Sequence, residues 1–231
     1  MTFIRFNWAV GARALIFALA WLYLPLWAFI LLALWCYFTP LFNAGRFFTP
    51  FLVLMAIVLA EAPSAVMAVI LALIFYYLLL IKDLLVIDRA TAHELLTILL
   101  SFFLFRVFFF NLSHGPTGAA LAWAFLAALL WSMLLNNLIV SLVVFKDGHQ
   151  GVRRIIDWIS FLLMAEALTV VLFLPLNFIY QSILVFLVAI LFIELLPDHI
   201  SGVLQPSKIR LTGTVVFTLT VIVLAAAKWG I

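Results

Sequence analysis

Charged residues are scarce in this chain, and their scarcity excludes a water-soluble fold. Only 9% of the 231 residues are charged, whereas 69% are hydrophobic. An ordinary soluble domain has about 25% charged and about 45 to 50% apolar residues. No stretch of this chain is polar enough to form a soluble domain beside a membrane domain. We therefore expect residues 1–231 to form a single integral membrane domain with short connections.

Cysteines and runs of basic residues are also lacking, and each absence removes a class of function. Cys36 is the only cysteine, so no intrachain disulfide can form. The net charge is +3, but the basic residues stand singly or in pairs, unlike the blocks that follow a phosphate backbone. We expect membrane lipids and no nucleic acid as partners. A protein partner or a homo-oligomer stays open.

Motifs of known enzyme classes are missing as well. The sequence has no His-Glu-x-x-His, no paired-aspartate prenyl or phosphate motif and no cysteine cluster. Thr91 and Glu94 fit a helix capping box, in which Thr91 caps the helix and Glu94 reaches back, so Glu94 needs no catalytic role. We expect no cofactor and no metal site. The remaining acids and histidines gather in segments that we place on the cytoplasmic side: Asp83, Asp88, His93, Asp147, His149, Asp198 and His199.

Long apolar runs are abundant, and they predict an all-α bundle of transmembrane helices. A helix satisfies its own backbone hydrogen bonds in lipid, and about 17 to 25 apolar residues cross the hydrocarbon core. Pro63 and Pro175 each separate two apolar runs and predict tight turns between helices. The later part of the chain predicts helices over residues 92–112, 118–145, 155–174, 176–196 and 210–228.

The segment over residues 14–42 is too long for one upright helix and is interrupted at Pro25. It could form one tilted, kinked span or a hairpin of two short helices. Trp21, Tyr23 and Trp27 surround the proline, and such aromatic side chains prefer the headgroup level to the bilayer centre. This pattern favours a hairpin that turns at Pro25.

Charge placement supports the same hairpin. With nine spans and a cytoplasmic N-terminus, every basic residue outside the helices except Lys228 lies in a cytoplasmic segment, as the positive-inside rule requires. An eight-span alternative has to export Arg5 and Arg13. We therefore expect about nine spans, built largely of short hairpins, in a bacterial inner (plasma) membrane. The C-terminus then lies outside the cytoplasm.

Two charged residues lie deep within apolar runs and are the leading candidates for a site. Arg106 stands nine residues before Gly115, and Glu166 stands nine residues before Pro175, so both lie at nearly the same depth. A charge in the hydrocarbon core is costly and needs a partner or water. Three interpretations are open: an ion pair that fixes how two helices dock, an intramembrane solute or proton site, and two independent groups.

Two weaker candidates complete the set. Asn136 and Asn137 form a secondary polar patch, for which hydrogen bonding between helices is the simpler explanation. Lys146, Arg153 and Arg154 flank a loop with two glycines and could bind an anionic headgroup, although cytoplasmic loops carry basic residues in any case.

Three function classes follow from these residues. A small transporter or channel-like protein is favoured slightly because of Arg106, Glu166 and the asparagines, and it predicts a hydrated cavity. A non-catalytic membrane subunit or scaffold is the alternative, and it predicts paired charges in a dry core. A lipid-modifying enzyme ranks third, because it requires acids and histidines that converge.

Overall fold

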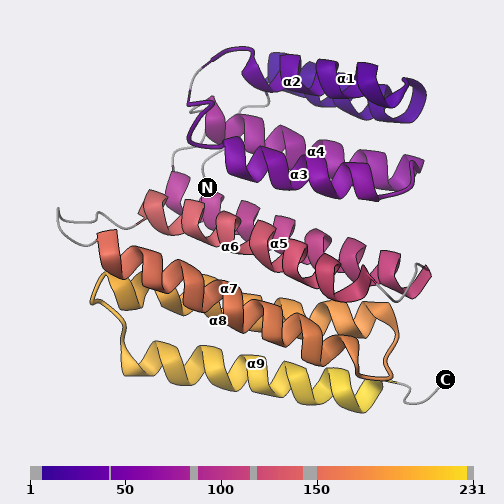
Figure 1. The fold of residues 1–231 in the computed structure, drawn as a ribbon. Coiled ribbons are helices and arrows are strands. Elements are labelled where there is room, and N and C mark those ends of the chain that lie inside the picture. Colours follow the sequence, from indigo (N-terminus) through magenta and orange to yellow (C-terminus); the bar gives the residue numbers. More distant parts are fainter. Residues whose placement is uncertain (1–6, 42, 84–87, 115–118, 143–149, 228–231) are drawn as a thin grey trace. The chain divides into compact units, whose positions relative to one another are not determined.

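The computed structural model describes residues 7–41, 43–83, 88–114, 119–142 and 150–227 (Figure 1). Within these ranges every regular element is an α-helix, and no strand occurs, so the predicted all-α class is confirmed. Nine helices follow one another along this part of the chain: α1 (Trp8–Tyr23), α2 (Leu26–Phe38), α3 (Phe48–Ala60), α4 (Ala65–Lys82), α5 (Arg89–His114), α6 (Ala120–Leu142), α7 (Gln150–Leu172), α8 (Phe178–Ile200) and α9 (Pro206–Ala226).

The helices fall into two classes by length. Six of them, α4 to α9, are long and apolar enough to cross a membrane. The other three, α1 to α3, are apolar but have only 13 to 16 residues. At 1.5 Å per residue they are about 20 to 24 Å long, below the usual hydrocarbon thickness of about 30 Å.

The chain forms two compact units, Met1–Leu96 and Thr97–Ile231. Helices α1 to α4 belong to the first unit, and α6 to α9 belong to the second. Helix α5 begins in the first unit and continues in the second. Both units consist of apolar helices.

Helices α1 and α2 form the hairpin that the sequence predicts at Pro25. Helix α1 ends at Tyr23, and Pro25 is the N-cap residue of α2. The guanidinium group of Arg13, near the start of α1, donates a hydrogen bond to the carbonyl of Thr39, just beyond the end of α2. The two helices therefore run antiparallel. This contact excludes the alternative of one kinked span, which would place Arg13 and Thr39 at opposite ends.

An aromatic core joins the four helices of the first unit. Phe17 of α1 stacks on Phe75 of α4, with ring centroids 4.3 Å apart, and also meets Phe29 of α2 edge to face. Tyr37 of α2 stacks on Phe51 of α3 at 4.2 Å. All five rings are buried, and such pairs add to the stabilisation that their burial provides.

In the second unit, α6 packs against α7, α7 against α8, and α8 against α9, as the order of the ribbons in Figure 1 also shows. Helix α7 ends at Leu172 and α8 begins at Phe178, which confirms the turn predicted at Pro175. The buried amide of Gln181 donates to the carbonyls of Val171 and Leu174. These carbonyls lie at and just beyond the end of α7, and the Gln181 amide adds to the backbone hydrogen bonds that they accept from the N–H groups of Leu174 and Leu176.

Several predicted helix ends are wrong in detail. Helix α7 begins at Gln150 instead of residue 155, α9 begins at Pro206 instead of residue 210, and α8 continues to Ile200 instead of ending at residue 196. The last turns of α8 carry Glu194 and Asp198, which form ion pairs with Lys208 of α9. Helix α5 is capped by Asp88 instead of Thr91: the backbone N–H of Thr91 donates to the Asp88 carboxylate at 3.2 Å, and its hydroxyl donates at 2.7 Å. Asp88 directly precedes the first helical residue, as an N-cap residue must.

Candidate functional site

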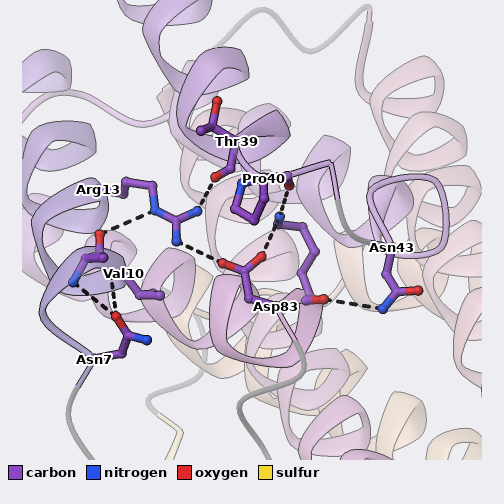
Figure 2. Close-up of polar contacts among 9 residues, drawn as sticks. Asn7, Val10, Arg13, Thr39, Pro40, Asn43 and Asp83 are labelled. Atoms are coloured by element: carbon purple, nitrogen blue, oxygen red, sulfur yellow. Dashed lines mark hydrogen bonds and ion pairs between the residues drawn. The ribbon is translucent and has the colours of Figure 1, made fainter.

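In the part of the chain that the structure describes, a group of charged side chains with a fully buried lysine lies in the first unit, where the start of α1 meets the ends of α2 and α4 (Figure 2). Arg13 comes from the second turn of α1, Lys82 is the last residue of α4, and Asp83 is its C-cap residue. We call these three residues the charged cluster. Asn7 fixes the start of α1 beside it, because its side-chain oxygen accepts from the backbone N–H groups of Ala9 and Val10.

Arg13 uses all three guanidinium nitrogens within the first unit. One Nη atom donates to Asp83 Oδ2 at 2.8 Å, the other donates to the Thr39 carbonyl, and Nε donates to the Ala9 carbonyl at 3.3 Å. Figure 2 shows the guanidinium group lying between Thr39 and Asp83. Arg13 thus joins α1 to both α2 and α4 through one planar group with several donors.

Lys82 is fully buried, which is rare for a lysine unless it is paired. Its ammonium group donates to the Pro40 carbonyl at 2.7 Å and lies 2.6 Å from Asp83 Oδ1. It also lies 5.7 Å from the centre of the Tyr37 ring, within reach of a cation–π interaction. The backbone carbonyl of Lys82 accepts from the Asn43 side chain at 3.5 Å.

Backbone carbonyls join the single carboxylate in binding the two cations of the charged cluster. Two cations face a single carboxylate, but the carbonyls of Thr39 and Pro40 lie at the C-terminal end of α2. Carbonyls at that end of a helix carry partial negative charge. Each cation of the cluster thus meets both the carboxylate and a backbone carbonyl, and these contacts tie three helix ends together.

The leading candidates, Arg106 and Glu166, lie on α5 and α7 of the second unit. Arg106 is half-buried and takes part in an interaction, whereas Glu166 is exposed. Among the residues that the structure describes, no ion pair joins the two side chains. Their pairing stays a prediction. Glu166 lies six residues before the end of α7, in the middle part of an apolar helix.

The asparagine patch lies on α6. Asn136 and Asn137 are both half-buried, and both take part in interactions. Ser132 and Ser141, which flank them, donate to carbonyls of their own helix at 2.9 and 2.7 Å. The serine hydroxyls are thus used locally.

The basic group at the start of α7 is described only in part. Lys146 lies outside the described residues, and so does the side chain of Arg153. Arg154 is exposed. Headgroup binding by these three residues stays a prediction.

The acids and histidines of the expected cytoplasmic side occupy separate local positions where the structure describes them. Asp83 belongs to the charged cluster, Asp88 caps α5, and Asp198 binds Lys208 at 2.8 Å. The buried ring of His93 packs edge to face on Phe47, with centroids 5.1 Å apart. No three His, Cys, Asp or Glu side chains in the described ranges are grouped so that they could hold a metal ion.

The fold and these contacts define the class of protein, a helical chain with six helices long and apolar enough to span a membrane. Comparison with known proteins adds no relative: no family model matches the chain, and no curated protein or solved structure matches it. Function therefore has to be argued from the residues themselves.

Proposed function

We propose that the protein is a non-catalytic subunit or scaffold of a membrane assembly. The observation that supports this proposal most is the charged cluster. Asp83 pairs with both Arg13 and Lys82, the two cations also donate to backbone carbonyls, and Lys82 is fully buried, which is the arrangement expected of a structural brace. A catalytic or transporting group has to keep an acceptor or donor available for its substrate.

The proposal includes the topology expected from the sequence. The short helices α1, α2 and α3 cross the membrane together with the six longer helices, giving nine spans in a bacterial inner membrane. Their length of about 20 to 24 Å requires local thinning of the bilayer or packing against longer neighbours.

Transport or conduction is the second candidate, and one observation favours it. Arg106 and Glu166 lie well inside apolar helices, and ionisable residues in such positions often mark pathways for ions or protons. The exposed position of Glu166 on α7 argues for the structural role, because a transport site faces the interior of its bundle. An enzyme ranks below both, since Asp83, Asp88, Glu194 and Asp198 are engaged in a helix cap or in ion pairs.

A pair of measurements tests the structural role against transport. Purified protein in liposomes should give no ion conductance and no proton flux above protein-free vesicles. Cross-linking in native membranes should recover one other membrane protein, or further copies of this chain, at a constant ratio. A selective flux that the Glu166→Gln variant abolishes would establish transport instead.

A further inference from the structure

Helices α8 and α9 are joined near the turn between them by a lysine that binds two carboxylates. The ammonium group of Lys208, in the first turn of α9, lies 2.8 Å from Asp198 Oδ2 and 3.6 Å from Glu194 Oε2. Both acids belong to the last turns of α8. All three side chains are about one-third exposed. The start of α9 is thus tied to the end of α8 by charge.

Two of these charges have the unfavourable sign for the helix that carries them. The N-terminus of a helix carries partial positive charge, and the C-terminus carries partial negative charge. Lys208 is the third residue of α9, and Asp198 lies two residues before the end of α8. Each charge is therefore unfavourable in its own helix, and the ion pair offsets that cost when the two helix ends lie side by side.

The rest of α9 adds little packing against α8. Within Pro206–Ala226, all of which the structure describes, Val216 is the one buried residue. A methyl group added at Gly213 would meet no atom of another helix within 4 Å, so α9 is loosely packed in its first half. At the far end, the Tyr180 hydroxyl donates to the Ala226 carbonyl at 3.4 Å, which is long for such a bond. The ion pairs therefore carry much of the attachment of α9 to α8.

The connection between the two helices is fixed in its first part and free of such bonds in its second. Gly202 adopts a left-handed φ of 70°, and the backbone N–H of Val203 donates to the Asp198 carbonyl at 3.0 Å. These contacts close the end of α8. Gln205, the N-cap residue of α9, makes no side-chain capping bond. Leu204 and Gln205 are therefore the residues about which α9 can swing.

We propose that Lys208 is an electrostatic latch that holds α9 on α8, and that α9 swings away about Leu204 and Gln205 when the latch opens. Dissolved salt screens the charges of such a latch, because the Debye length falls from about 8 Å at physiological ionic strength to about 3 Å at 1 M. The docked fraction of α9 therefore depends on ionic strength. This device is independent of the structural role proposed above.

A distance measurement between α8 and α9 tests the latch. Spin labels at Ile179→Cys, near the start of α8, and at Ile222→Cys, near the end of α9, occupy exposed positions far from the swinging point. Cys36 is buried and stays unlabelled. Double electron–electron resonance in liposomes should give mainly one narrow distance. Lys208→Ala should lower the ratio of docked to open α9 by about twofold to fivefold, the upper part of the range for exposed ion pairs.

Two controls separate the latch from other effects of losing a lysine. Arg210 is an exposed cation of the same helix end, but its guanidinium group donates to the Pro206 carbonyl of its own helix at 3.5 Å. Arg210→Ala should leave the distance distribution unchanged. In a chain that already carries Glu194→Gln and Asp198→Asn, Lys208→Ala should cause no further loss. Circular dichroism checks that each variant keeps its helices.

Ionic strength provides the second arm of the test. Raising the salt concentration to about 1 M should shift the distances of the latched chain in the same direction as Lys208→Ala. The same change should have little effect on the Lys208→Ala variant. Distance distributions that neither Lys208→Ala nor salt alters would overturn the latch, and so would an equal shift in Arg210→Ala.

Discussion

Asp83 is the residue on which the charged cluster depends, because among the described residues its carboxylate alone pairs with both Arg13 and the buried Lys82. Asp83→Ala should lower the free energy of unfolding by about 3 to 5 kcal/mol, since it leaves the fully buried Lys82 and the half-buried Arg13 without a counter-charge. Equilibrium unfolding in mixed micelles measures the loss. Asp198→Ala is the matched control: Asp198 also binds a cation at 2.8 Å but is one-third exposed, and should cost about 1 kcal/mol or less. Equal losses for the two variants would contradict a structural brace.

Asp88 controls a more local feature, the first turn of α5. The hydroxyl and then the backbone N–H of Thr91 lower the pKa of the Asp88 carboxyl. A carboxyl whose pKa is lower in the folded state stabilises that state above its unfolded pKa of about 3.9, and the contribution is lost as the pH falls through the folded pKa. Amide exchange in the first turn of α5 should therefore accelerate, relative to intrinsic rates, as the pH falls through that range.

Two substitutions separate the cap from its charge. Asp88→Ala should show fast exchange in this turn at every pH. Asp88→Asn should keep the cap, because asparagine is also a good N-cap residue, and should lose the pH dependence. A pH dependence that persists in Asp88→Asn would rule out Asp88 as its source.

Prediction from sequence was least complete at the residue scale. The sequence predicted a capping box formed by Thr91 and Glu94. In the structure Asp88 caps the helix instead, because it directly precedes α5 and its carboxylate accepts from the backbone N–H of Thr91. Asp83 was expected only in a segment on the cytoplasmic side. That Arg13 would reach Asp83 depends on which helices are neighbours, and no local pattern carries that information.

At the scale of elements, the turn between α7 and α8 depends on Gln181. Its amide donates to carbonyls at the end of α7 from a buried position. Gln181→Leu should destabilise the second unit by about 0.5 to 1.5 kcal/mol, because the turn loses its side-chain hydrogen bonds while the Val171 and Leu174 carbonyls keep their backbone donors. Gln205→Leu, at the exposed N-cap of α9 where the side chain makes no capping bond, should have little effect. Unfolding in mixed micelles compares the two variants.

The α1–α2 hairpin poses a different question, whether both short helices cross the membrane. Leu24 lies at the turn of the hairpin, and Leu41 lies beyond the end of α2; both are exposed. If both helices cross, a membrane-impermeant maleimide should label Leu24→Cys and Leu41→Cys from opposite sides of sealed vesicles. Labelling of both from one side would show a re-entrant hairpin and lower the span count. The wild-type chain treated with the same maleimide is the control and should stay unlabelled, because its cysteine, Cys36, is buried.

Elements were predicted well wherever proline or aromatic residues mark a turn. The hairpin at Pro25 and the turn at Pro175 are both present, because proline restricts the residue before it and aromatic side chains favour the interface. Helix ends rich in charge were harder to locate. The end of α8 was placed too early, at residue 196, although its last turn carries Asp198, which pairs with Lys208 of the next helix.

For the whole molecule, the number of spans and the orientation are linked. An odd number of spans with a cytoplasmic N-terminus places the C-terminus outside. A periplasm-dependent reporter fused after Ile231 should therefore be active. The same reporter fused at Gly202, in the turn between α8 and α9, should be inactive. The reverse pattern would contradict the expected orientation.

The amino-acid sequence by itself determined that the chain is helical and apolar and where most of its hairpins turn, because helix length, hydropathy and proline act within a short stretch of chain. Only the tertiary structure decided which helix ends meet. It joined Arg13 to Thr39 and Asp83, buried Lys82 and left Glu166 on the exposed side of α7. Lateral packing of one apolar helix on another depends on the fit of many side chains, and in lipid the hydrophobic effect does not choose among their faces.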